Sequence, residues 1–362
     1  MSSTSGFEQS CSVPVSPKIT AQNTAPETIE IVSPVAIINP QAGKGSLAQR
    51  WHGLAKQLLR HYRELEILET CCRGHATQLC RQALERGSTM VISVGGDGTA
   101  NEVLGGFMDE RGTNVFPQSC LGLIAAGSGG DFQRNFGRLS PQAQVQEFAG
   151  TRVQSMDYGV ACFVDHQGQR RVRAFLNVAS VGLSGHVVAK IGGSSGTDGL
   201  GDRSSSGGAP VHIGRYPTLS YLRAALQGIA KYRNRPVDVA YNRGVPRRVD
   251  LNLACIANGQ YFGSGMWVSP KSQVDDGHFD VIELENLNRI QLLATLAKVY
   301  QGRHLRVAGI RSTRAKFVEF RVPGPYDVLL EVDGESLGKL PASFEMVSGG
   351  IAVKIVTGDL SS

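Results

Sequence analysis

The stretch Val94–Glu102 reads VGGDGTANE and combines three glycines with one aspartate. It ends the apolar run Val91–Val94 and leads into Asn101–Met108, a segment that favours a helix. Consecutive glycines let backbone N–H groups approach phosphate oxygens closely, and the start of a helix adds a favourable dipole. A single GGDG is equally typical of a tight turn in which an aspartate caps the helix. This stretch alone leaves both a polyanion site and a plain turn open.

Two further glycine-rich loops follow expected strands. NPQAGKG occupies Asn39–Gly45 after the first apolar run, and AAGSGGDF occupies Ala125–Phe132 at the end of the fourth. Because ligands bind at the carboxyl ends of parallel strands, we expect the three loops to converge on one crevice. The P-loop pattern GxxxxGK[ST] and the Rossmann spacing GxGxxG are both absent from the sequence. The loops therefore predict a nucleotide site of another kind.

The pattern of apolar residues predicts two different halves. The first half alternates short apolar runs with amphipathic segments, a rhythm typical of an α/β domain with a parallel sheet. From about Val160 onward, short β-branched segments are bounded by Gly, Pro or Asn-Gly, which predicts a mostly antiparallel β domain. The expected strands are Val35–Ile38, Leu65–Leu68, Val91–Val94, Leu121–Ala125, Ala174–Val178, Val237–Ala240, Leu251–Ala257, Phe279–Glu283, Phe317–Val322, Val328–Val332 and Ile351–Ile355. The expected helices are Leu47–Leu59, Ala76–Arg86, Ser220–Arg233 and Asn288–Gln301.

Length and composition set the domain organisation. The chain has 362 residues, more than one domain usually holds. We expect a disordered tail over 1–32, where Ser, Thr, Pro and Gln dominate, a nucleotide-binding domain over 33–157 and a β-rich domain over 158–357. The Gly/Ser-rich stretch 192–208 is expected to be a flexible insertion in the second domain.

Net charge and cysteine content indicate the kind of partner that the protein binds and the compartment in which it works. A net charge of +6 and a pI near 9.0 favour an anionic partner, without choosing between nucleic acid, membrane surface and phosphorylated substrate. No apolar run approaches bilayer length and no secretory signal is evident, which predicts a cytoplasmic protein. The seven cysteines form no CxxC pair, so we expect reduced structural thiols.

A basic stretch lies late in the chain. Between Asn286 and Val318 there is no acidic residue. Such a stretch is more often a solvated face, although docking on anionic lipid stays open. It lacks interleaved aromatic residues, which argues against nucleic-acid binding. Its basic residues are Arg289, Lys298, Arg303, Arg306, Arg311, Arg314 and Lys316. The apolar residues Leu292, Leu293, Leu296 and Val299 have helical spacing and are assigned to the core.

Later motifs follow the glycine loops in a fixed order. They are SMDYG at Ser155–Gly159, FLNVASVG at Phe175–Gly182, NGQYFGSG at Asn258–Gly265, DGHFD at Asp276–Asp280 and VDGE at Val332–Glu335. With the three loops, this order resembles the diacylglycerol kinase catalytic domain family, which includes sphingosine and ceramide kinases and bacterial lipid kinases. The resemblance extends from about Val35 to Ile355. It implies a fold like that of the NAD and diacylglycerol kinases, and an ATP-dependent lipid kinase that uses Mg²⁺.

The resemblance also implies roles for individual residues. The residues implied to contact ATP are Asn39, Gly43, Lys44, Thr70, Gly96, Gly98, Thr99, Asn101, Glu102 and Ser128. The implied catalytic residues are Glu335 as proton acceptor, Asp333 beside it, and Asp97 at the magnesium or its water shell. Lys44, Asp97, Asp157 and Asp333 would form a charged network across the cleft, and Gln273, Asp276 and His278 would hold a structural magnesium.

Several simpler interpretations stay open beside the resemblance. Asp333-Gly334 between β-branched runs is also a strong hairpin signal, Asp276-Gly277 suits a plain turn, and Asp157 could cap a turn. For the whole chain, a NAD or other small-metabolite kinase and a catalytically silent lipid- or nucleotide-binding regulator are alternatives to a kinase acting on a diacylglycerol or sphingoid base. The expected partner is a lipid at the inner face of the membrane and not nucleic acid, with peripheral membrane association and a homodimer as further expectations.

Overall fold

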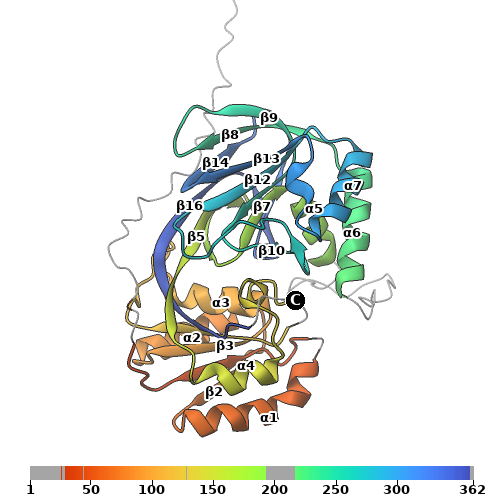
Figure 1. Ribbon diagram of the computed structural model, residues 1–362. Helices are drawn as coiled ribbons and strands as arrows, with labels where there is room; N and C mark the ends of the chain where they lie inside the picture. The colour runs from red at the N-terminus through yellow and green to blue at the C-terminus, as the bar shows by residue number, and fades with distance from the viewer. Residues whose placement is uncertain (1–25, 27–28, 44, 128, 193–216, 359–362) are drawn as a thin grey trace, which may run out of the picture.

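The computed structural model describes residues 26, 29–43, 45–127, 129–192 and 217–358. Figure 1 shows an α/β half below a β-rich half, with the long strands β5 (Val153–Asp165) and β16 (Glu335–Ile355) running between them. Most of the expected tail and residues 193–208 of the expected insertion lie outside the described residues. The end of the expected tail is ordered, because Ile29 and Ile31 pack against the core of the α/β half.

The α/β half is built around four strands that pair in parallel. β1 lies between β2 and β3, and β4 continues the sheet beyond β3. The strands are β1 (Val35–Ile38), β2 (Glu66–Glu69), β3 (Met90–Gly95) and β4 (Cys120–Ala125). The helical segments are α1 (Ser46–His61), α2 (His75–Glu85), α3 (Asp97–Phe107), η1 (Gln133–Phe136) and α4 (Pro141–Phe148).

Helices cover both faces of these strands. Side chains alternate along a strand, so Val35 and Ile37 of β1 face the core shared with α2 and α3. Ala36 and Ile38 face the opposite core, which includes residues of α1 and α4. Burial on both faces explains why β1, β3 and β4 appear in the sequence as continuous apolar runs, whereas the edge strand β2 is partly exposed. The glycine loops leave at the carboxyl ends of β1, β3 and β4.

The second half is mostly antiparallel, and this prediction is confirmed. Its sheet runs β13-β12-β9-β7-β15-β16, and further strands pair off this path. The strands are β5 (Val153–Asp165), β6 (Arg170–Phe175), β7 (Val178–Gly182), β8 (Arg235–Tyr241), β9 (Arg247–Ala257), β10 (Tyr261–Phe262), β11 (Met266–Trp267), β12 (Phe279–Glu285), β13 (Ile310–Ala315), β14 (Phe317–Arg321), β15 (Leu329–Val332) and β16 (Glu335–Ile355). The helical segments are α5 (Leu183–Gly192), α6 (Pro217–Lys231), α7 (Arg289–Val299) and η2 (His304–Arg306).

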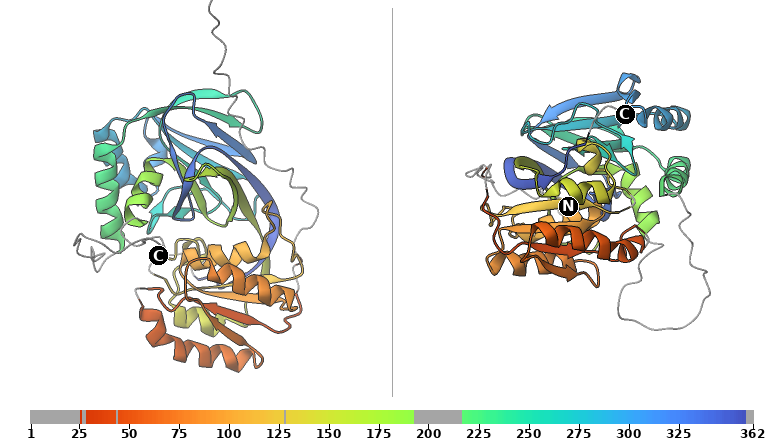
Figure 2. Two further views of the ribbon diagram at one scale, coloured as in Figure 1. Left: turned by 180° about the vertical axis from the view of Figure 1, so that it is seen from behind. Right: turned by 60° about the horizontal axis from the view of Figure 1, so that its bottom comes forward.

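Helices α5, α6 and α7 lie together at one side of the β-rich half in both Figure 1 and the rear view of Figure 2. They share a core with β7, β9 and β12 to which Val187, Ile229 and Leu292 contribute. The sequence assigns Leu293 to the core as well, but this prediction is wrong. Leu293 is 43% exposed on the outer side of α7. No helix in the described ranges has the length and apolar character needed to cross a bilayer.

Strand β16 joins the two halves into one sheet. Its early residues pair with β15 and β14, and its last residues, Ala352–Ile355, pair in parallel with Cys120–Leu123 of β4. The domain boundary at residue 157 stays a prediction. The pairing nevertheless shows that the end of the chain returns to the α/β half.

Candidate active site

Two of the glycine loops pack directly against each other. A Cβ atom on Gly127 would lie 2.4 Å from the Cα of Gly96, and one on Gly95 would lie 2.5 Å from Oγ1 of Thr99. A side chain at Gly127 would push the two loops apart, and one at Gly95 would collide with Thr99 in the first turn of α3, so both positions require glycine. The loop after β3 and the loop after β4 thus form one continuous backbone surface at the start of α3.

Asp97 ties the same two loops together. Its Oδ2 accepts a hydrogen bond from the backbone N–H of Asp131 at 3.1 Å, and its Oδ1 accepts one from Phe132 at 3.2 Å. Asp97 also lies in the first turn of α3, where a negative charge is favourable. The carboxylate therefore braces the third loop while facing the crevice.

The first glycine loop reaches the same place. The side-chain amide of Asn39 donates to Oγ1 of Thr99 at 3.3 Å, and its carbonyl oxygen accepts from the N–H of Gln41 at 3.0 Å. Gly43 has φ 60°, and a Cβ there would lie 2.8 Å from Oγ of Ser46. All three loops converge as the sequence predicts. Lys44 and Ser128, two of the expected ATP contacts, lie outside the described residues.

The loops enclose a cavity of about 500 Å³. Predicted site residues that line it are Asn39, Thr70, Gly96, Asp97, Gly98, Thr99, Glu102 and Glu335. Lining residues that were not predicted are Gln41, Ala42, Cys71, Cys72, Arg73, Ala76, Gly127 and Gly129. Gly43 and Asn101, both expected to contact ATP, are absent from the lining. The cavity therefore joins all three loops to one acidic residue of the β-rich half.

Glu102 has a clear structural partner. Its Oε1 accepts from the N–H of Gly74 at 2.8 Å, and its Oε2 accepts from Ala76 at 3.2 Å. These N–H groups belong to the start of α2, where helices leave backbone donors unsatisfied. Glu102 therefore anchors the segment before α2 to α3 at the edge of the cavity.

Asp333 and Gly334 form a two-residue hairpin turn between β15 and β16. Val332 pairs with Glu335, and the two turn residues have φ values of 46° and 83°. Such positive values suit a tight hairpin, so the predicted turn is confirmed. The turn places Asp333 inside the protein and Glu335 at the cavity, although only one residue separates them.

Asp333 is half-buried, and its carboxylate is fully engaged in hydrogen bonds. Its Oδ2 accepts from Nδ2 of Asn101 at 2.8 Å and from the N–H of Leu176 at 3.1 Å. Its Oδ1 accepts from the N–H groups of Asn177 and Val178, both at 3.1 Å. Burial raises the pKa of Asp333 to about 6, against the effect of these hydrogen bonds.

These contacts also explain a difference from the expected secondary structure. The sequence predicts one strand over Ala174–Val178, but β6 ends at Phe175 and β7 begins at Val178. The backbone N–H groups of Leu176 and Asn177 point at Asp333 instead of a neighbouring strand. A side-chain acceptor has replaced the strand pairing there.

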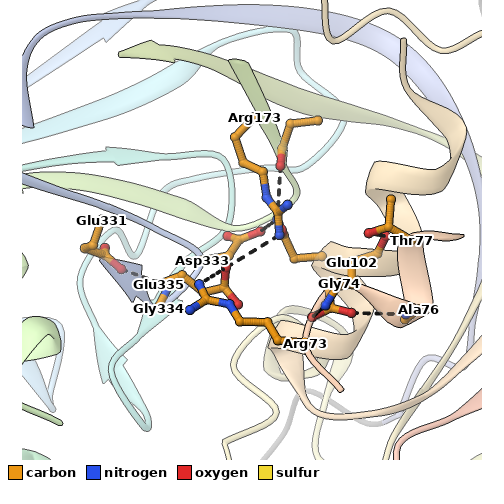
Figure 3. A network of polar contacts seen from close by, with 12 residues as sticks. Arg73, Gly74, Ala76, Thr77, Glu102, Arg173, Glu331, Asp333, Gly334 and Glu335 are labelled. Atoms are coloured by element: carbon orange, nitrogen blue, oxygen red, sulfur yellow. Dashed lines mark hydrogen bonds and ion pairs between the residues drawn. The ribbon is translucent and has the colours of Figure 1, made fainter. Parts of the chain in front are cut away.

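Glu335 is held by two arginines. Nη2 of Arg73 lies 2.9 Å from its Oε2, and Nη2 of Arg173 lies 3.6 Å from the same oxygen. Arg73 comes from the segment before α2 and Arg173 from β6. Figure 3 shows Glu335 in this network, with Asp333 and Glu102 nearby. Sequence reasoning missed both arginines, because only the tertiary structure brings them to Glu335.

Asp157 contacts the loop that is expected to hold magnesium, and neither lines the cavity. Asp157 accepts from the N–H groups of Gly277 and Gly349, both at 2.6 Å, and burial raises its pKa. It therefore joins the loop before β12 to the bulge in β16. Its carboxylate partners are these backbone groups, and the charged network expected with Lys44, Asp97 and Asp333 stays a prediction.

The residues expected to hold a structural magnesium have other partners. Asp276 pairs with Nη2 of Arg314 at 2.5 Å, and Nδ1 of His278 lies 2.8 Å from the main-chain oxygen of Asp276. Gln273 is exposed. Within the described ranges, no three His, Cys, Asp or Glu residues group as a metal site. A magnesium held by main-chain oxygens at this loop stays a prediction.

The fold and the cavity define a nucleotide-dependent kinase with glycine loops from one domain and an acidic residue from the other. Two family descriptions match the chain. They are the diacylglycerol kinase catalytic domain over residues 33–161 and the YegS C-terminal NAD kinase beta sandwich-like domain over residues 194–355. The chain therefore carries a match to the first of these domains in its first half and to the second in its second half.

Relatives and one solved structure resemble this chain over most of its length. A diacylglycerol kinase of Mycobacterium tuberculosis strain H37Rv is 25% identical over 328 residues, which cover 90% of this chain and 95% of the relative. A diacylglycerol kinase of Bacillus subtilis strain 168 is 26% identical over 314 residues, which cover 85% and 91%. A crystal structure of a diacylglycerol kinase from Bacillus anthracis str. Sterne superposes with a TM-score of 0.63 at 20% identity, covering 91% of this chain and 98% of that one. This last likeness supports the fold.

Proposed function

We propose that this chain is an ATP-dependent lipid kinase that transfers the γ-phosphate to a hydroxyl group of a diacylglycerol, sphingoid base or related lipid. One observation carries the proposal: Glu335 of the β-rich half lines the same cavity as the three glycine loops. Backbone N–H groups of such loops suit a nucleotide's phosphates. A carboxylate across the same cavity suits the proton of an attacking hydroxyl.

The proposed reaction needs few steps from the protein. The hydroxyl oxygen forms a bond to the γ-phosphorus, the bond to the β,γ-bridging oxygen breaks and ADP leaves. The hydroxyl proton goes to Glu335. Asp333 is a positioning residue, because its two oxygens already accept four hydrogen bonds. It holds the hairpin that presents Glu335.

Magnesium belongs to the proposal, and the site suits it. Mg²⁺ in kinases is held by one or two carboxylates together with substrate phosphates and water. Asp97 lines the cavity, and each of its oxygens accepts one backbone hydrogen bond, which leaves a lone pair on each. Asp97 would hold the ion or a water of its shell. The ion would neutralise charge that develops on the phosphates.

An apolar pocket in the β-rich half suits a lipid chain. It lies under α5, α6 and α7, and its cavity is about 80 Å³. This volume holds only a few methylene groups, so an acyl chain would enter only if the helices shift apart. Its apolar lining includes Leu183, Val187, Ile229, Leu253, Phe262, Met266, Val268, Leu284, Leu292, Leu296 and Val299.

The hairpin β10–β11 links this pocket to the nucleotide loops. Phe262 and Met266 line the pocket, while the N–H of Ser264 at the hairpin's tip donates to Oδ2 of Asp131 at 2.8 Å. Asp131 belongs to the third glycine loop. A lipid chain in the pocket would therefore lie against an element that already contacts the nucleotide side of the cleft, which supports a lipid as the acceptor.

Membrane contact and a homodimer stay predictions. The outer side of α7 offers some support for membrane contact, because Ile290 is 79% and Leu293 is 43% exposed beside the exposed Arg289. An amphipathic face with basic residues suits an anionic lipid surface. Arg314, another member of the basic stretch, is instead paired with Asp276.

The test is transfer of labelled γ-phosphate from Mg-ATP to diacylglycerol, sphingosine, ceramide, monoacylglycerol and phosphatidylglycerol in mixed micelles. Glu335→Gln is assayed beside the wild type, and Glu66→Gln is the control because Glu66 is an exposed carboxylate paired with Arg86. We expect one labelled lipid that depends on Glu335 and not on Glu66. Phosphorylation of NAD or another soluble acceptor, with no lipid product, would contradict the proposal.

A further inference from the structure

Two arginines and one carboxylate meet at the rim of the nucleotide cavity. Arg73 and Arg173 both address Oε2 of Glu335, at 2.9 Å and 3.6 Å. The two guanidinium groups carry one positive charge more than Glu335 alone balances, while Asp97 and Glu102 also line the cavity. Arg73 and Glu335 also line the cavity itself. Two guanidinium groups beside the glycine loops suit an anionic ligand that offers several oxygens.

Both arginines also have guanidinium N–H donors that Glu335 does not engage. The side chain of Arg73 is 69% exposed, so most of its guanidinium donors are open to a ligand. Nε of Arg173 is buried and has no hydrogen-bond partner among the described residues. A guanidinium has five N–H donors in a planar fork that matches carboxylate and phosphate oxygens. The carboxylate of Glu335 satisfies only a small part of this capacity.

The backbone that carries each arginine is held in place by hydrogen bonds. The segment that carries Arg73 is anchored at Thr70, whose N–H donates to the oxygen of Ile38 at 2.8 Å. It is anchored again at Gly74, which donates to Glu102. Arg173 belongs to β6 and pairs with Ala161 of β5. Exchange of partners therefore needs movement of side chains only.

We propose that Arg73 and Arg173 form a subsite for the terminal phosphate of the bound nucleoside triphosphate, which Glu335 fills when nucleotide is absent. This inference rests on the proposed function. A terminal phosphate carries more negative charge than a carboxylate and offers three oxygens, so it displaces Glu335 from the guanidinium groups. The released Glu335 then faces the acceptor hydroxyl as a free carboxylate.

The exchange of partners gives Arg73 and Arg173 two roles. A carboxylate that stays between two guanidinium groups is poorly placed to accept a proton, because protonation would break both contacts. After the exchange, the same guanidinium groups stabilise charge on the transferring phosphate. Arrival of a triphosphate thus both binds the group to be transferred and frees the proton acceptor.

The test compares binding of the β,γ-imido analogue of ATP with binding of ADP by titration calorimetry, without lipid. Arg73→Gln and Arg173→Gln are expected to weaken the analogue about tenfold or more while ADP changes much less, because only the analogue has a terminal phosphate. Arg73→Lys is expected to restore part of the loss. Arg86→Ala, at the exposed end of α2, is the control.

Glu335→Gln provides the second arm. It removes the competing carboxylate charge, so we expect the analogue to bind several-fold more tightly than to the wild type, although the variant is a poorer kinase. The subsite would be overturned if the arginine variants lost affinity for ADP and for the analogue equally. It would also be overturned if Arg73→Gln, Arg173→Gln, Arg73→Lys and Glu335→Gln all bound the analogue as the wild type does. Failure of the wild type to bind either nucleotide would instead count against the proposed function. Thermal unfolding of each variant separates lost binding from lost folding.

Discussion

Nδ2 of Asn101 lies 2.8 Å from Oδ2 of Asp333, although 232 positions separate the two residues. Asn101 is part of α3, which begins at the GGDG loop, and Asp333 is part of the hairpin that presents Glu335. Nδ2 of Asn101 also lies 3.0 Å from the main-chain oxygen of Ala174. One buried amide therefore joins the nucleotide loops to the β-rich half, and it fixes the distance between them.

Asp333→Asn tests the positioning role of this carboxylate. An amide keeps one acceptor oxygen and turns an NH₂ group toward N–H donors, so donors that Asp333 satisfies lose their partner. We expect the free energy of unfolding in urea to fall by about 1–3 kcal/mol, together with kinase activity. Asp238→Asn, on the surface pair with Arg248, should change both quantities little. Equal stability of the two variants would show that Asp333 is not held as described.

Glu331 makes stability depend on pH. It is fully buried, accepts from Ser180 and from the N–H of Gly334, and burial raises its pKa from 4.5 to about 8. Because the folded state holds this proton more tightly, its contribution to stability is full below pH 4.5 and is lost as pH rises to about 8.

Glu331→Gln should remove that dependence while keeping an acceptor oxygen. We expect the unfolding free energy of the variant, relative to wild type, to rise by a few kcal/mol at most between pH 5 and pH 8.5, and to level off above. Urea unfolding at four pH values measures it. Acids that do not interact with Glu331, such as Asp131, titrate in both proteins and cancel in the difference. A difference that is flat over this range would contradict the assignment.

Gly127→Ala should separate the second and third loops. The added methyl would lie 2.4 Å from the Cα of Gly96, a backbone atom that cannot move aside cheaply. We expect ADP affinity, measured by titration calorimetry, to fall at least about tenfold as the loops part. Gly53→Ala is a matched control, because nothing lies within 4 Å of its Cβ on α1. Unchanged ADP binding in the first variant would show that the loops adapt.

Cys71 should report on occupancy of the cavity. It is exposed, lines the cavity and has its Sγ 3.2 Å from Nδ1 of His75. We expect iodoacetamide to alkylate Cys71 and reduce activity, and MgATP to slow the reaction. The buried thiols should resist, and burial raises the pKa of Cys120 to about 12. Mass spectrometry of tryptic peptides identifies the modified residue, and a rate that ATP does not affect would place the nucleotide away from Cys71.

Local patterns predicted much of the fold. The strand Val35–Ile38 has the predicted bounds, and the turn at Asp333-Gly334 is where the Asp-Gly pair places it. Both signals depend on residues that are neighbours in the chain. Convergence of the glycine loops was also predictable, because carboxyl ends of neighbouring strands share one edge.

Long-range contacts were not predictable in the same way. The sequence shows β16 only as Ile351–Ile355, whereas the strand runs from Glu335 with irregular register, and glycines within it obscure the pattern of alternation. Arg73 and Arg173 showed no signal, because basic residues are common on protein surfaces. Arg73 lies 262 positions before Glu335 in the sequence, and no local sequence pattern indicates that the two residues meet.

The sequence by itself determined which chemistry is available here. Glycine loops at strand ends and a DGE hairpin follow from local spacing and backbone freedom, so they could be found before any contact was known. Only the tertiary structure decided which atoms meet. It gave the carboxylate of Asp333 four hydrogen bonds, left Glu335 at the cavity and set two arginines against it. The physical reason is that burial and charge pairing depend on distances between segments, and sequence spacing does not encode those distances.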